Sequence, residues 1–220
     1  EVSRSLASCD AALLVVDASQ GVEAQTLANV YMAIENDLEI IPVLNKIDLP
    51  HADVAKVKKE IEDIIGIDAS EADEVSAKSG IGIEELLETI ITRVPKPEGD
   101  RSMPLKALIF DSWFDPYQGV VILVRVMEGT LKKREKFYLK ESGGSYEVLK
   151  MGVNSPFFTD QNELTAGDVG MIISGIKTIR DVSVGDTLVA DKARDTPALE
   201  GYEEVKPMVY AGVFCKEGDD

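Results

Sequence analysis

The spacing of apolar residues predicts that the first part of the chain alternates strands with helices. Residues 11–18 and 39–45 are short, mostly apolar runs of the kind found in buried parallel strands, and a shorter strand is predicted at residues 74–77. This order predicts a partial α/β domain, a parallel sheet with helices on both faces whose ligands lie at the carboxyl ends of the strands. Three helical faces accompany the strands: Leu27, Val30, Tyr31 and Ile34; Val54, Val57, Ile61, Ile64 and Ile65, with Gly66 as a stop; and Ile83, Leu86, Leu87, Ile90 and Ile91.

In the second part of the chain the spacing of apolar residues changes to one typical of short strands. Two prolines and a glycine in residues 94–100 end the third helix and predict a linker. Beyond it, short strands alternate with turn signals and no convincing amphipathic helix occurs, which predicts a small closed β-barrel. The predicted strands are residues 105–110, 119–127, 136–139, 146–151, 169–173 and 187–189. We therefore expect the α/β unit at residues 1–98, the β-barrel at 99–196, and a linker with the start of a third domain at 197–220.

Composition and charge narrow the class of protein. The 220 residues are 45% hydrophobic and 29% charged, as in a globular protein. A net charge of -17 excludes a protein that holds DNA or RNA by bulk electrostatics, although a local basic patch stays open. Cys9 and Cys215 lie far apart, which favours the reducing cytoplasm. No run approaches the roughly 20 apolar residues of a membrane span.

The ends of the sequence predict an internal piece of a longer protein. The chain begins with Glu1 rather than Met, in a segment typical of the back half of a helix. A new strand-like run at residues 205–214 follows close to the other end. Strands at the ends of a unit need partners, so we expect further chain on both sides.

The tetrad from Asn45 to Asp48 directly follows the second strand, where a base would lie. An Asp carboxylate can accept from both the N1–H and the N2 amine of guanine, a pattern that adenine does not offer. Asn45 can bond the acceptor edge of the purine and tie its loop to neighbouring loops, and the stem of Lys46 can lie along the base. Such a site discriminates strongly, because the wrong base leaves polar groups unpaired. Taken alone the tetrad is weak, since polar groups end many strands.

Ser76, Ala77 and Lys78 end the next strand, about 30 residues later. A tight turn there would direct backbone N–H groups at the guanine O6, which adenine replaces with a donor. The two signals in this order, on consecutive strands, are much more specific than either alone. They predict a guanine-binding site made of Asn45, Lys46, Asp48, Ser76, Ala77 and Lys78.

The tetrad resembles the fourth, and Ser76-Ala77-Lys78 the fifth, of the GTPase signature motifs. Residues 1–26 are similar to the segment after the second switch of translational GTPases. The runs DSWFDPYQGVV, VGDTL and VKPMVYAGVF resemble the elongation factor 4 (LepA) family over essentially the whole chain. The resemblance implies a ribosome-dependent GTPase acting in translational elongation, described as promoting back-translocation, with GTP and GDP as substrate and product. It also implies ribosomal RNA, ribosomal proteins and tRNA-loaded ribosomes as partners, in the cytoplasm and peripherally on the inner face of the membrane.

Two motifs that the GTPase family uses for phosphate binding and catalysis are missing from this sequence. No Gly-Lys dipeptide occurs in the 220 residues, so the phosphate-binding loop is absent, and so is the second-switch histidine. His51 follows the tetrad on the base side of the site, so it does not replace the missing second-switch histidine. We therefore expect no catalytic and no metal-binding residue here, with Mg²⁺ ligands only in the full-length protein, and an inactive fragment. The alternatives are a non-catalytic ribosome-binding module, or a sister translational GTPase of the elongation factor G or BipA type.

The densest basic cluster follows the turn at Gly129 and consists of Lys132, Lys133, Arg134 and Lys136. By family resemblance the barrel faces the small ribosomal subunit, so the cluster is a candidate contact for rRNA phosphates. The alternative is a solvated hairpin whose charges discourage edge-to-edge strand pairing. The sequence leaves both interpretations open.

Overall fold

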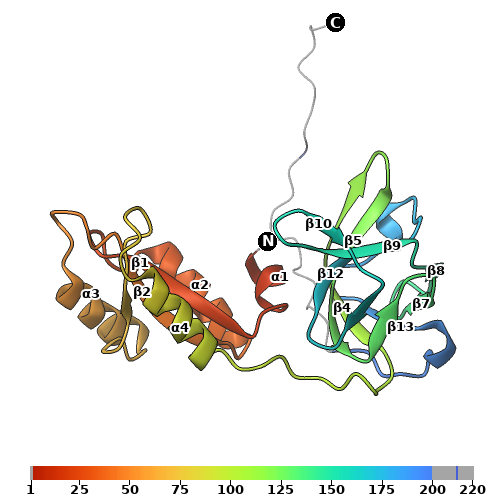
Figure 1. Cartoon of the computed structure of the whole chain (residues 1–220), viewed down its shortest axis with the longest axis horizontal. Coiled ribbons are helices and arrows are strands. Elements are labelled where there is room, and N and C mark those ends of the chain that lie inside the picture. Colours follow the sequence, from red (N-terminus) through yellow and green to blue (C-terminus); the bar gives the residue numbers. More distant parts are fainter. Residues whose placement is uncertain (1, 200–211, 213–220) are drawn as a thin grey trace, which may run out of the picture.

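The computed structural model describes residues 2–199 and residue 212, in two units joined by an extended segment (Figure 1). The strand-like run predicted at residues 205–214, and with it the expected third domain, lies outside the described residues apart from Gly212. In the part of the chain that the structure describes, every helix is too short or too polar to cross a membrane.

The first unit contains a three-stranded parallel sheet in the order β1-β2-β3. The register pairs Asp17 at the end of β1 with Asn45 at the end of β2, so the loops that follow the two strands begin side by side. The elements are α1 (Val2–Leu6), β1 (Ala11–Asp17), α2 (Ala24–Glu35), β2 (Glu39–Asn45), α3 (Val54–Glu60) with a π-helical continuation η1 (Ile61–Ile65), β3 (Asp73–Glu74) and α4 (Ile83–Arg93).

Side chains of β2 alternate between two hydrophobic clusters. Leu44 packs with Leu14 and Val16 of β1, and the same cluster includes Val30 of α2 and Val57 of α3. Ile41 and Val43 instead pack with Val75, Ile83 and Leu86, which belong to the β3–α4 region. Burying both sets stabilises the sheet, since each fully buried aliphatic side chain contributes about 1.5–3 kcal/mol.

Several details of the first unit differ from the sequence prediction. Of the apolar faces predicted for the first two helices, Tyr31 of α2 is 53% exposed and Ile64 of η1 is 50% exposed. The third strand is much shorter than residues 74–77, because only Val43 and Leu44 of β2 have partners on it. The predicted inward face of α4 is too wide: Leu87 is 53% and Ile91 72% exposed. The helix buries only the side that contacts β2 and β3, and its other flank faces solvent. By contrast, Gly66 does end its helix in the left-handed conformation, with φ at +83°.

The second unit is an antiparallel β domain around one core. Eight strands form a sheet in the order β10-β9-β12-β5-β4-β13-β7-β8, and β6 pairs with β11. Buried side chains from both ends of this order, such as Met151 of β9 and Phe137 of β7, belong to the same cluster. The elements are β4 (Lys106–Asp115), β5 (Gly119–Glu128), β6 (Thr130–Lys132), β7 (Lys136–Leu139), β8 (Ser145–Glu147), β9 (Lys150–Asn154), β10 (Phe158–Asp160), β11 (Glu163–Thr165), β12 (Val169–Ile173), η2 (Ile179–Asp181), β13 (Thr187–Ala190) and η3 (Asp191–Ala193).

The turn between β5 and β6 requires glycine for two reasons. Gly129 has a φ of +77°, and a Cβ there would lie 2.7 Å from backbone atoms of Met103 and Leu105. Gly143 has the same φ of +77°, but a Cβ placed there would have the Tyr138 hydroxyl, at 3.7 Å, as its nearest contact. We expect Gly143→Ala to cost about 1–2 kcal/mol of unfolding free energy from the backbone alone. Gly129→Ala should cost roughly 1–3 kcal/mol more, because the backbone must also move. Urea denaturation of both variants checks this, and equal losses would contradict the steric account.

An ion pair between described residues, Asp10 and Arg125, joins the two units. Arg125 of β5 is 5% exposed, and its Nη2 lies 2.5 Å from Oδ1 of Asp10, which precedes β1. Figure 1 shows α1 lying between the parallel sheet and the β domain. A buried guanidinium without a carboxylate partner would be costly. The pair therefore favours an arrangement in which the start of β1 stays docked on the outside of β5.

Candidate functional site

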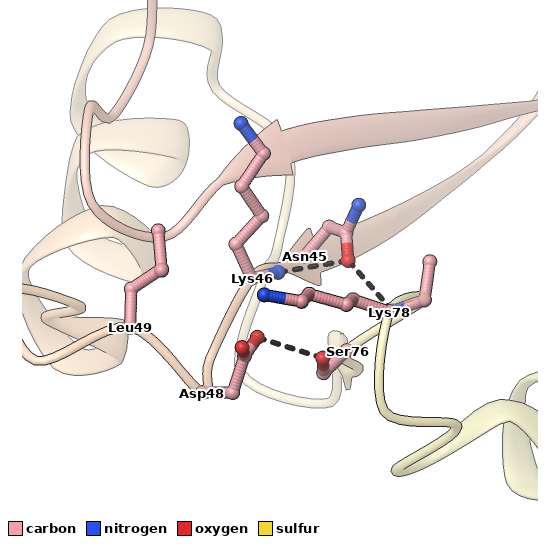
Figure 2. A pocket seen from close by; sticks show the side chains of 7 residues that line it. Asn45, Lys46, Asp48, Leu49, Ser76 and Lys78 are labelled. Carbon is pink, nitrogen blue, oxygen red and sulfur yellow. Dashed lines mark hydrogen bonds between the residues drawn. The ribbon is translucent and has the colours of Figure 1, made fainter.

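The loops after β2 and β3 enclose a pocket at the carboxyl ends of the strands, where parallel sheets bind ligands (Figure 2). Its volume is about 280 Å³, which lies just below the roughly 300–1,000 Å³ of most ligand pockets. A pocket of this size suits one base better than a whole nucleotide. The lining consists of Asn45, Lys46, Asp48, Leu49, Ser76, Ala77 and Lys78, so the structure brings all six sequence-predicted site residues together.

Asn45 ties the two loops to each other. Its Oδ1 accepts the backbone N–H of Lys46 at 2.8 Å and that of Ala77 at 3.1 Å. Because two N–H groups fix the position of the oxygen, the side-chain Nδ2 is turned away from them, as Figure 2 shows. An amide donor at this edge can serve an acceptor on a bound ring.

Asp48 is held by the second loop. Its Oδ1 accepts the hydroxyl of Ser76 at 2.7 Å, and Ser76 itself is fully buried. The Ser76 backbone is fixed in turn, since its N–H donates to Ile81 and its carbonyl accepts the N–H of Gly80. A carboxylate has about four acceptor positions, so the bond from Ser76 leaves acceptors for two further donors. Asp48 can therefore receive a pair of N–H groups from a planar ligand.

Lys46 departs from ordinary strand geometry and pairs with Asp17. Its φ is +65°, in the left-handed region that costs a side-chain-bearing residue roughly 1–2 kcal/mol. Its Nζ lies 2.6 Å from Oδ2 of Asp17, while Ser19 donates its backbone N–H and its hydroxyl to Oδ1. The hydrogen bond from Lys46, followed by those from Ser19, lowers the pKa of Asp17 to about 2. The same bond to Asp17 raises the pKa of Lys46.

Some features of the pocket were not expected from the sequence. Leu49 contributes to its lining and Asp17 contacts Lys46, although neither belongs to the two motifs. The expected donor role of the second loop also changes in detail. The sequence predicted that backbone N–H groups of this loop face the ligand, whereas the N–H of Ala77 donates to the side-chain oxygen of Asn45. The side chains of Lys46 and Lys78 extend from different loops, with the Lys46 ammonium directed away from Asp48 (Figure 2).

The basic cluster of the β domain lies on the turn from β6 to β7, with acidic residues beside it. Lys133 forms an ion pair with Asp160 at 2.7 Å. Lys132 is paired in register with Glu163, and Lys136 with Glu147. Arg134 is exposed and has a φ of +68°. Neighbouring carboxylates reduce the positive potential of this surface, which favours the solvated-hairpin interpretation over a strong phosphate site.

Metal chemistry has no obvious place in the residues that the structure describes. Among them, no group of three or more His, Cys, Asp or Glu side chains is arranged to hold a metal ion. The side chains at the pocket offer hydrogen-bond donors and acceptors from two loops.

Comparisons with known families agree with the two units. Residues 1–96 match the Elongation factor Tu GTP binding domain, and residues 119–189 match Elongation factor Tu domain 2. The fold and the pocket thus define a chain of the translation-factor class, in which a GTP-binding domain is followed by a β domain.

Curated relatives narrow this class to one family. The chain is 57% identical to elongation factor 4 of Exiguobacterium sibiricum over 97% of its length, and 58% identical to that of Synechococcus elongatus over 100%. It is 56% identical to elongation factor 4 of Oleidesulfovibrio alaskensis, also over 100%. The chain belongs to the elongation factor 4 family. It spans about a third of the length of these relatives, 35–37%.

Proposed function

We propose that this chain carries the guanine-recognition half of the nucleotide site of a ribosome-dependent GTPase of the elongation factor 4 type. One observation carries the proposal: Asp48, fixed by Ser76, and Asn45, which links both loops, converge on a pocket large enough for a base. Asp48 would accept the N1–H and N2 amine of guanine, and the Nδ2 of Asn45 would donate to its acceptor edge. Lys46 and Lys78 would cover the faces of the ring with their stems.

Membership of the family supports a proposal for the role of the whole protein. GTP would be the substrate and GDP the product, with Mg²⁺ held by residues outside this chain, in translational elongation on the tRNA-loaded ribosome. The described residues would supply base recognition and none of the catalytic groups. A cytoplasmic location fits this role, while peripheral association with a membrane is carried by the family resemblance alone.

We also propose the domain limits 1–98, 99–196 and 197–220, with helices on both faces of the parallel sheet, and a closed barrel for the second unit. The two hydrophobic clusters on β2 support the placement of helices on both faces of the sheet, because α2 and α3 contribute to one cluster and α4 to the other.

Titration of the chain with GMP and with AMP tests the proposal. Base contacts provide only part of the affinity of a nucleotide, so we expect a dissociation constant for GMP on the order of millimolar, or about -4 kcal/mol. AMP should bind at least tenfold more weakly, because it leaves the Asp48 carboxylate without its two donors. Amide chemical shifts of Asn45, Ala77 and Asp48 in NMR spectra report binding at the pocket. Equal responses to both nucleotides would overturn the proposed base specificity.

A further inference from the structure

Asp17 lies outside both guanine motifs, yet its side chain reaches the site through Lys46. The register places Asp17 beside Asn45 at the ends of neighbouring strands. Oδ2 of Asp17 contacts the Lys46 ammonium at 2.6 Å, and only 15% of the Asp17 side chain is exposed. The ion pair therefore connects the end of β1 to the residue that forms one side of the pocket.

The Asp17 carboxylate is held in place before it meets Lys46. Ser19 donates its N–H at 2.8 Å and its hydroxyl at 2.6 Å to Oδ1. Both oxygens are thus occupied by different partners, so a rotation of the carboxylate would break bonds on either side. The Asp17 backbone is also fixed, since its carbonyl accepts the N–H groups of Gln20 and Gly21. This geometry provides a rigid anion rather than a mobile one.

Lys46 is the kind of residue that needs such an anchor. Its side chain is 54% exposed, and a lysine stem with four rotatable bonds loses considerable entropy when it is held in one conformation. Its left-handed backbone directs the side chain out of the alternation of β2. Strain at a ligand site persists only where surrounding contacts stabilise it, and here they are the Asn45 bond to the Lys46 N–H and the Asp17 bond to its ammonium.

We propose that Asp17 is a positioning residue of the guanine site: it anchors the Lys46 ammonium at the end of β1, so that the Lys46 stem is held as a wall against the face of the bound base. This inference rests on the proposed function. Asp17 touches no ligand in this arrangement and acts only through Lys46. It also neutralises the ammonium, so the wall presents its methylene groups rather than its charge to the ring.

Three variants test the inference by GMP titration. Asp17→Asn removes the charge but retains an acceptor for Ser19, and Lys46→Met removes the ammonium but retains an apolar stem. Each should weaken GMP binding about two- to fivefold, the range of a partly exposed ion pair. Combining them should weaken it no further, because both break the same contact. The matched control is Asp191→Asn, since Asp191 likewise pairs with an arginine at 2.6 Å and accepts a serine hydroxyl, far from the pocket. It should leave GMP binding unchanged.

The outcomes separate the inference from the function it rests on. If the unaltered chain prefers GMP to AMP and Asp17→Asn behaves like Asp191→Asn, the positioning role is wrong and the guanine site stands. If Asp17→Asn and Lys46→Met weaken binding additively, Asp17 acts through the Ser19 turn instead, which also overturns the inference. If the unaltered chain shows no preference, the proposed function fails and the inference fails with it. Should Asp17→Asn unfold the chain, as its amide spectrum would show, Lys46→Met decides alone: unchanged GMP affinity contradicts the anchoring role.

Discussion

Asp48→Asn should abolish binding of GMP to this chain and create binding of xanthosine monophosphate. The substitution replaces one acceptor oxygen with an NH₂ donor, which then faces the N2 amine of guanine, donor against donor. Asp48 is exposed in the free chain and would be covered by the bound base, where a polar mismatch of this kind can cost a factor of about 10⁴ in discrimination, so the millimolar GMP signal should disappear. Xanthine carries a carbonyl at that position and an N1–H beside it. The asparagine amide can accept from the N1–H and donate to the carbonyl, so affinity on the order of millimolar should return.

Amide NMR shifts at Asn45 and Ala77 measure both effects in one series of titrations. Asp63→Asn is the matched control, because it makes the same change of charge at an exposed position outside the pocket lining. That variant should bind GMP as the unaltered chain does. Retention of GMP binding by Asp48→Asn would show that Asp48 does not read the base. The bond from Ser76 should survive, since an asparagine oxygen also accepts a hydroxyl, so loss of fold does not explain the expected result.

Phe137→Ala should strongly destabilise the β domain. Phe137 is fully buried in the core, and its ring lies 5.9 Å from that of Tyr146 in a tilted arrangement. Removing a buried phenyl ring costs its transfer free energy plus that of the cavity, together about 3–5 kcal/mol. For a unit of this size each kcal/mol lowers the melting temperature by about 4–8 °C, so a fall of at least 12 °C or so is expected.

Differential scanning calorimetry of the chain measures this change. Phe157→Ala is the control, because it deletes the same ring from a position that is 83% exposed. Surface substitutions usually stay within about 0.5 kcal/mol, and the melting temperature should shift by only a few degrees. Similar shifts in both variants would mean that Phe137 does not belong to a tightly packed core.

The α/β unit was largely predictable because its strands are apolar and its turns are marked. Residues 39–45 were predicted as a strand and form β2, and residues 11–18 were predicted where β1 lies. Leu87 and Ile91 were assigned to the buried face of α4 incorrectly. A helical apolar stripe shows which side of a helix avoids water, but not how much of that side a neighbouring sheet covers.

The β domain was less predictable, because its strands change partners within short distances. Residues 146–151 were expected to form one strand but belong to β8 and β9. The reason lies between them: the N–H of Val148 donates to Glu135, whereas that of Leu149 donates to Ile173 on another strand. Three-residue strands such as β6 and β11 show no readable alternation. The spacing of hydrophobic residues indicates which side chains are buried, but it does not reveal which neighbouring strand provides their backbone hydrogen bonds.

The pocket residues were predictable from two short motifs, and the residue that holds Lys46 was not. Asp17 lies 29 positions before Lys46 and has no motif of its own. Only the parallel register of β1 and β2 reveals that their carboxyl ends meet. Leu49 was missed for a similar reason, because lining a pocket depends on loop shape rather than on residue type.

The ion pair between Asp10 and Arg125 also has a consequence for the time course of folding. The two residues are 115 positions apart, and the interval between them contains the strands and long helices of the first unit but only β4 and part of β5 of the second. Closing so long a loop is entropically unfavourable until the intervening chain has folded, so the contact should form after the barrier to folding of each unit. Contacts absent from a transition state act on the rate of unfolding and leave the rate of folding nearly unchanged. The pair should therefore slow the separation of the two units and lengthen the lifetime of the docked arrangement, without accelerating its formation.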